Sequence, residues 1–191
     1  RLRAIEGAAR AEAGVVRLAV TPSIAAAIMP AVVERFRAAH AGVQIEMRDM
    51  ESRAVVEALK GERADIGLAT AAETDGIARR RLFSDAFGAV VPAGHPLAGR
   101  AACGWADLAG ERFISNGLCD LIPDAAFAPI REGAGLRVPN TTSLLALVRA
   151  AVGVTVLPRL ALARGEAGVA FVPLQAVGTR REVHLITRAG R

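Results

Sequence analysis

The sequence predicts an α/β fold whose sheet is largely parallel. Short apolar segments typical of buried strands alternate along the chain with segments whose apolar residues recur at helical spacing. Hydrophobic residues make up 52% of the chain and charged residues 23%, a balance that favours a folded core over disorder. The length of 191 residues is sufficient for one domain or for two small ones.

The first half of the chain reads as strands joined by helices. Three strands separated by two helices favour a parallel sheet with right-handed crossovers. Pro30 lies inside the first helical pattern and predicts either a kink or a new helix start there. The expected elements are an apolar strand over 15–20, a helix that ends at Gly42, an alternating strand over 43–48, a helix from its cap Ser52 to Lys60 with Gly61 after it, and a buried strand over 65–69.

The second half repeats this alternation. Two further strands are expected over 77–83 and 86–91, and residues 92–97, with two prolines and a glycine, read as a crossing between two lobes. The other expected elements are helices over 105–108, 120–130, 144–151 and 159–164, and strands over 112–114, 136–138, 153–157, 169–172 and 182–187.

Hydroxyl side chains follow the predicted strands of the first half. Thr21 and Ser23 come directly after the first strand, and Thr70 follows the third. Ligands of open α/β sheets bind beyond the carboxyl ends of the strands, and a helix start adds unpaired N–H groups that favour an anion. We therefore expect these three residues to contact a small ligand, with plain helix capping as the alternative for Thr21 and Ser23.

The second half offers two similar positions. Ser115 and Asn116 follow a strand, and Thr141 and Thr142 precede a helix. We expect these residues to contact the same ligand. The alternatives are an ordinary polar turn for the first pair and a simple helix start for the second.

The sequence gives no sign of an enzyme, a metal centre or a cofactor. The three histidines are far apart, no nucleophile, zinc, phosphate or dinucleotide motif occurs, and the carboxylates fall singly. Cys103 and Cys119 fit no metal spacing. They are expected to be small buried hydrophobes, with a redox pair as the alternative.

The net charge of +5 does not by itself indicate a nucleic-acid surface. The arginines are scattered, and with one tryptophan and no tyrosine there is little for bases to stack on. No apolar stretch is long enough to span a membrane. The chain opens on Arg1 rather than methionine, so we expect a fragment of a longer cytoplasmic protein.

Five short motifs occur in an order and spacing typical of one family. Together they resemble the effector-binding domain of LysR-type transcriptional regulators, and the resemblance covers nearly the whole chain from Gly14. The motifs lie at 29–37 (MPAVVERFR), 59–68 (LKGERADIGL), 91–97 (VPAGHPL), 105–108 (WADL) and 143–158 (SLLALVRAAVGVTVLP).

The resemblance implies two Rossmann-like lobes joined by crossover strands, a periplasmic-binding-protein-like (type 2) architecture with the effector between the lobes. Residues 1–13 would be the end of a linker helix, 14–91 with 172–191 lobe I, and 92–171 lobe II. The family's ligand contacts fall on the same strand ends, here Thr21, Ser23, Thr70, Ser115 and Asn116. We expect the turn before the later helix, with Thr141 and Thr142, to face the same cleft.

The resemblance also implies partners. These are a small effector, further copies of the chain in homodimers and tetramers, promoter DNA bound through an N-terminal winged helix-turn-helix outside this chain, and RNA polymerase as a further candidate. The function expected is allosteric: binding an effector, possibly one with a carboxylate, biases the oligomer arrangement. The alternative is a transporter's solute-binding protein, which has a similar two-lobe fold but needs an export signal.

Overall fold

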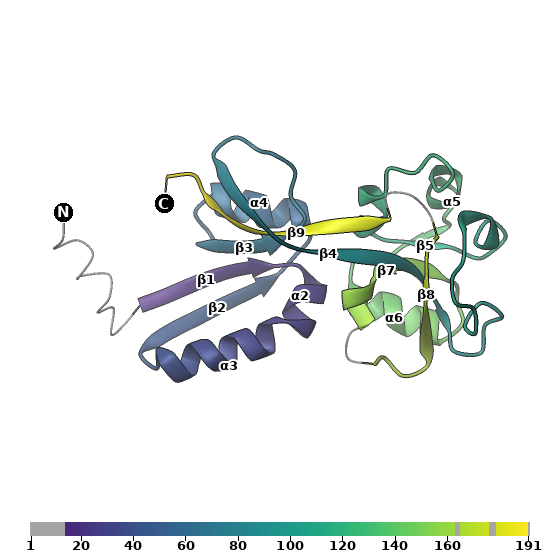
Figure 1. Cartoon of the computed structure of the whole chain (residues 1–191), viewed down its shortest axis with the longest axis horizontal. Helices are drawn as coiled ribbons and strands as arrows, with labels where there is room; N and C mark the ends of the chain where they lie inside the picture. Colours follow the sequence, from purple (N-terminus) through teal and green to yellow (C-terminus); the bar gives the residue numbers. More distant parts are fainter. Residues whose placement is uncertain (1–13, 163–164, 176–178, 191) are drawn as a thin grey trace. The chain divides into compact units, whose positions relative to one another are not determined.

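The computed structural model (Figure 1) consists of two compact units, and it describes residues 14–162, 165–175 and 179–190. The first unit contains the described residues up to Leu82 and those from Val183 onward, and the second is Phe83–Glu182. The divisions fall inside the long strands β4 (Ile77–Pro92) and β9 (Arg180–Arg188), whereas the sequence places them at 91/92 and 171/172. The linker helix predicted for residues 1–13 lies outside the described residues.

The first unit contains the predicted parallel sheet. Its strands are β1 (Gly14–Val20), β2 (Val43–Asp49) and β3 (Ile66–Ala69). β1 pairs in parallel with both β2 and β3, while β9 pairs antiparallel with β3. This arrangement confirms the strands and the parallel pairing expected from the alternating apolar pattern.

The apolar helix expected after β1 is two helices. α2 (Pro22–Ala27) is short, and α3 (Met29–Ala39) begins after a break at Ile28. Pro30 lies in the first turn of α3, where a missing N–H costs little, so the new start is the alternative that the structure adopts. Figure 1 shows α3 running alongside β2.

The helix α4 (Ser52–Lys60) covers one face of the sheet over Gly67. A Cβ atom on Gly67 would lie 2.7 Å from Val55 Cγ1 and 2.9 Å from Leu59 Cδ1, so only glycine admits the helix this closely. Val55 and Leu59 are fully buried, and with Ile186 of β9 they belong to the core of this unit. Their burial fixes the position of α4 on the strands.

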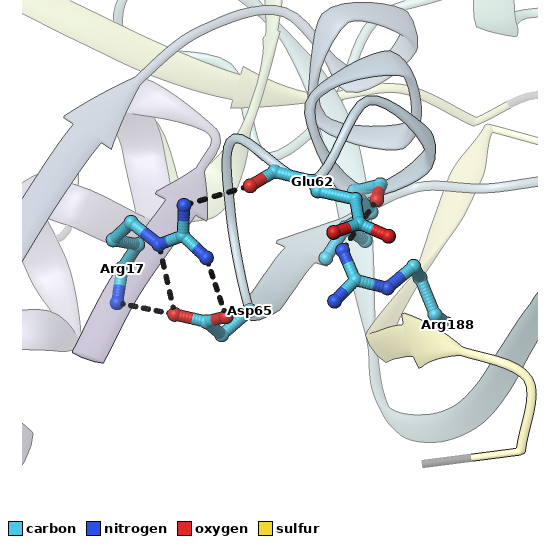
Figure 2. Close-up of polar contacts among 5 residues, drawn as sticks. Arg17, Glu62, Asp65 and Arg188 are labelled. Carbon is cyan, nitrogen blue, oxygen red and sulfur yellow. Dashed lines mark hydrogen bonds and ion pairs between the residues drawn. The ribbon is translucent and has the colours of Figure 1, made fainter. Parts of the chain in front are cut away.

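Two arginines hold the carboxyl end of α4. Arg17 of β1 donates from Nη1 to the carbonyl oxygen of Glu62 at 2.7 Å, and Arg188 of β9 donates to that of Leu59 at 3.1 Å, as Figure 2 shows. The same Arg17 pairs with both carboxylate oxygens of Asp65 through one edge of its guanidinium, Nε at 3.1 Å and Nη2 at 2.9 Å. Its contact with Asp65 raises the pKa of Arg17. One carbonyl of the last turn of α4 and one carbonyl just after the helix thus accept hydrogen bonds from cationic donors.

Glu62, just after α4, has a φ angle of +57°, which an L-residue adopts at a cost. Replacing Glu62 with glycine is expected to raise the free energy of unfolding by about 0.5–1 kcal/mol, because the relief of strain exceeds the added entropy of the unfolded chain. Urea unfolding followed by circular dichroism measures the change. Lys60→Gly, at the last residue of the helix, is the control and is expected to lower the free energy of unfolding by up to about 1 kcal/mol. A loss of stability in Glu62→Gly would contradict the prediction.

The second unit is built on the second half of β4. This strand pairs antiparallel with β7 (Thr155–Pro158) and β8 (Val169–Pro173), and a small parallel pair joins β5 (Ile114–Ser115) to β6 (Leu136–Arg137). Its helical segments are α5 (Ala128–Glu132), α6 (Thr141–Arg149) and the 3₁₀ turns η1 (Trp105–Asp107), η2 (Gly117–Leu121) and η3 (Arg159–Leu162).

Two predictions for the middle of the chain are wrong. The strands expected over 77–83 and 86–91 are one continuous strand of 16 residues, because its polar centre is satisfied by β9: Arg180 donates to Ser84, and Arg181 pairs with Asp85. The helix expected over 120–130 is η2 and α5 with non-helical chain between them. Pro123 explains the gap, since it disfavours helix at the residue before it.

Candidate functional site

Three hydroxyl side chains lie at the carboxyl edge of the first unit's sheet. Thr21 follows β1 and Thr70 follows β3, and Ser52 begins α4 after the end of β2. The parallel register sets Val20 opposite both Asp49 and Leu68, so all three strands end at one edge. The N–H of Thr21 donates to the carbonyl of Leu68 at 3.0 Å, which holds Thr21 against β3.

All three hydroxyls are buried without a hydrogen-bond partner in the part of the chain that the structure describes: Thr21 Oγ1, Ser52 Oγ and Thr70 Oγ1. Thr21 is only 2% exposed, and although it stands at the N-cap position of α2, its side chain makes no capping bond. The capping alternative is therefore wrong for Thr21. A buried hydroxyl without a partner is unfavourable, and a ligand oxygen would satisfy it.

Ser52 was predicted to cap α4, and this prediction is wrong. The N-cap residue is Glu51, Ser52 is the first helical residue, and no side chain caps the helix. Its uncapped position at the edge was not predicted, because the sequence pattern does not fix a helix start to within one residue. The available signal was related to the one used for Thr21, a hydroxyl shortly after the end of a strand.

Three of the N–H groups expected to hold an anion after β1, those of Thr21, Ile24 and Ala25, already donate within the fold. The N–H of Thr21 bonds to Leu68, Pro22 has none, and those of Ile24 and Ala25 both donate to the carbonyl of Thr21 at 2.9 Å. Ser23 is buried and has an interaction partner. The uncapped start of α4, a helix of nine residues, is the better source of N–H donors at this edge.

In the second unit, the side chain of Asn116 makes several hydrogen bonds within the fold. It is 3% exposed, and its Nδ2 donates to Thr155 Oγ1 and to the carbonyl of Val156, both at 3.1 Å. Its Oδ1 accepts the N–H of Leu118 at 2.9 Å, which caps η2. One lone pair of Oδ1 is left for a ligand. Thr155, which sequence reasoning missed, donates in turn to the carbonyl of Ile114 at 2.7 Å.

The other predicted contacts of this unit differ in burial. Ser115 is buried, with Oγ 3.4 Å from the carbonyl of Leu136. Thr141 and Thr142 lie in the first turn of α6, which starts earlier than expected; Thr141 is partly buried and Thr142 exposed. The helix is capped by Asn140, whose Oδ1 accepts the N–H of Ser143 at 3.0 Å. Ligand contact by these residues stays a prediction.

A family model described as the LysR substrate binding domain matches residues 9–191. The chain belongs to this family. GltC of Bacillus subtilis (strain 168), a transcriptional dual regulator, is 25% identical over 189 residues, which cover 93% of this chain and 62% of GltC. The dual regulator OxyR of Escherichia coli (strain K12) is 24% identical over 187 residues, covering 93% and 61%. The chain thus spans less than two thirds of either relative.

Solved structures confirm the predicted fold class. The effector-binding domain of QuiR in complex with shikimate matches with a TM-score of 0.79 at 22% identity, covering 94% of this chain and 89% of that one. The LysR-family fold is therefore the expected periplasmic-binding-protein-like (type 2) α/β architecture. Membership of a family of transcriptional regulators also favours the regulator over the transporter component.

No metal centre or membrane span is evident in the described part of this LysR-family domain. The described residues contain no group of three or more histidine, cysteine or acidic side chains placed to hold an ion. Nor does any helix in those ranges have the length and apolar character needed to cross a bilayer.

Both cysteines of the domain are buried and free, as expected of small core side chains. Burial raises the pKa of Cys119 to about 11 and also raises the pKa of Cys103. At pH 8 only about one Cys119 side chain in a thousand is then a thiolate, the form that reacts with oxidants. Nothing in this geometry favours a thiol sensor.

We expect neither cysteine to react with iodoacetamide at pH 8 while the domain is folded, and both to react in guanidinium chloride. Mass spectrometry of the alkylated chain counts the modified residues, and the denatured sample is the control for reagent and time. Alkylation of either thiol in the native sample at the denatured rate would contradict the burial and the raised pKa values.

Proposed function

We propose that this chain is the effector-sensing domain of a LysR-type transcriptional regulator, and that its effector is a small carboxylate bound at the carboxyl edge of the first unit. The proposal rests on the three buried hydroxyls without partners, Thr21, Ser52 and Thr70. Each can donate to a carboxylate oxygen, and the two oxygens of a carboxylate accept about four hydrogen bonds in all.

The electrostatic environment of this edge favours binding of a small anion. The uncapped N-terminus of α4 contributes the positive end of a helix dipole beside Ser52. None of the three hydroxyl residues is itself charged, so the anion is held by hydrogen bonds to neutral groups. The structural neighbour QuiR was solved with shikimate, a carboxylate that also carries hydroxyls.

We propose that effector binding regulates the whole protein through thermodynamic linkage between ligand binding and domain arrangement. An effector that binds one arrangement of domains or subunits more tightly biases the equilibrium toward it, typically by about 1–3 kcal/mol. We propose homodimers and tetramers, cytoplasmic location, and promoter binding through an N-terminal winged helix-turn-helix. RNA polymerase is proposed as a partner of that complex. Enclosure of the effector between two lobes, with Ser23, Ser115, Asn116, Thr141 and Thr142 among its contacts, stays a prediction.

Thr21→Val tests the site. Removing a hydroxyl that bonds a charged ligand is expected to weaken binding about 10- to 100-fold. The same change removes a buried hydroxyl without a partner, so the free energy of unfolding is expected to rise by about 1 kcal/mol. A thermal-shift screen of carboxylate metabolites supplies the ligand, and calorimetric titration of wild type and variant gives the affinities.

Ser52→Ala is also expected to weaken the binding of this ligand. Thr187→Val is the matched control, because Thr187 lies on β9 beyond Ile186, which pairs with Gly67, and so toward the opposite end of β3. Unchanged affinity in both Thr21→Val and Ser52→Ala would refute the proposed site. A screen in which no carboxylate stabilises the domain would refute the ligand class.

A further inference from the structure

A cavity lies beside α4 in the first unit. Its volume is about 110 Å³, and β1 lines it with Leu18 and Ala19 while α4 lines it with Ala54 and Ala58. Met50 and Ala64 complete its apolar wall, and Arg48, Glu57 and Arg63 are its charged members. None of the three hydroxyl residues at the carboxyl edge lines it, so it is separate from the proposed effector site.

The cavity exists because small residues meet where α4 crosses the sheet. Ala54 and Ala58 are four residues apart and therefore lie on one face of the helix. The neighbouring positions Val55 and Leu59 pack down on Gly67, which fixes the height of the helix. The small side chains of Ala19, Ala54 and Ala58 line the space that remains between the helix and the strand.

The charged side chains around the cavity carry an excess of positive charge. Glu57 is paired with Arg53 of the same helix, Oε1 to Nε at 3.2 Å. Among the described residues, neither Arg48 nor Arg63 has a hydrogen-bond or ion-pair partner for its guanidinium. A guanidinium offers several N–H donors in a plane that matches a carboxylate.

We propose that this cavity binds a short-chain aliphatic carboxylate, with the alkyl chain among the alanine methyls and the carboxylate on Arg48 and Arg63. The volume of about 110 Å³ is below the roughly 150 Å³ of a cavity that admits benzene. This size fits a chain of about four carbons and excludes an aromatic metabolite with several substituents. An apolar wall with a few polar groups at one end is typical of ligand pockets.

Butyrate is the probe for the test. With the alanine methyl groups of the domain labelled for NMR, titration is expected to shift Ala54, Ala58 and Ala64 with a Kd on the order of 1 mM. Butylamine has the same chain and the opposite charge, and it is expected to leave these signals in place. Formate, which lacks the chain, is expected to bind at least about tenfold more weakly.

Two variants separate this cavity from the effector site. Arg63→Gln is expected to lower the affinity for butyrate about tenfold by removing a charge-assisted hydrogen bond. Ala54→Leu fills the cavity and is expected to abolish the shifts of the alanine signals. Thr21→Val is expected to leave them unchanged. The proposal is overturned if butyrate shifts none of the three alanines, or if its affinity falls in Thr21→Val but not in Arg63→Gln.

Discussion

Replacing Asp85 with alanine is expected to lower the free energy of unfolding by about 3–5 kcal/mol. Asp85 of β4 accepts two hydrogen bonds from Arg181 of β9, from Nε at 3.2 Å and from Nη2 at 2.9 Å. Arg181 is 2% exposed, and burial lowers the pKa of Arg181 although Asp85 acts in the opposite direction. The variant would leave a buried guanidinium without its carboxylate, which costs far more than the pair itself contributes.

The double variant Asp85→Ala/Arg181→Met is the informative control. It removes the buried charge together with its partner, so it is expected to be more stable than Asp85→Ala alone. The fluorescence of Trp105, the only tryptophan of the chain, reports unfolding of the second unit during denaturant titration. A loss below about 1 kcal/mol in Asp85→Ala would show that water or another group replaces the carboxylate.

The same ion pair shows where sequence reasoning fails in this fold. Ser84 and Asp85 interrupt an apolar pattern, and locally such an interruption is typical of a turn between two strands. Their partners, Arg180 and Arg181, lie far along the chain, and no short-range sequence pattern predicts a contact between such distant residues. The continuity of β4 therefore depends on tertiary pairing. By contrast, β1, β2, α4 and α6 follow from periodicity within each segment.

The residues of the candidate site also differ in whether local sequence patterns predict them. Thr21 and Thr70 were predicted from a rule about strand ends, which needs only the order of strands and helices. Ser52 was assigned to a cap, because the choice between Glu51 and Ser52 as the first residue outside the helix turns on backbone angles that the sequence does not specify. Asn116 was predicted as a ligand contact from its place after a strand, and that contact stays a prediction. Its bond to Thr155 could not be predicted, because Thr155 belongs to a later strand and only the fold brings the two together.

The first unit combines a rigid platform with unsatisfied groups at one edge. Gly67 and the buried Val55 and Leu59 fix α4 on the sheet, and Arg17 and Arg188 hold its carboxyl end. The opposite end of α4, where Ser52 lies, has no cap. A helix secured at one end and open at the other presents its N–H groups at little cost in reorganisation, which favours tight binding of a small anion.

Asn116→Ala is expected to lower the free energy of unfolding by about 3 kcal/mol, since it removes a helix cap and leaves Thr155 Oγ1 and the Val156 carbonyl short of a buried donor. Asn140→Ala is the matched control. Asn140 also caps a helix, but it is exposed and makes only the capping bond, so its loss is expected to be about 1 kcal/mol. Trp105 fluorescence in denaturant measures both. Equal losses in the two variants would mean that the bonds from Asn116 to β7 add nothing to stability, and Asn116 would then be better explained as a ligand contact.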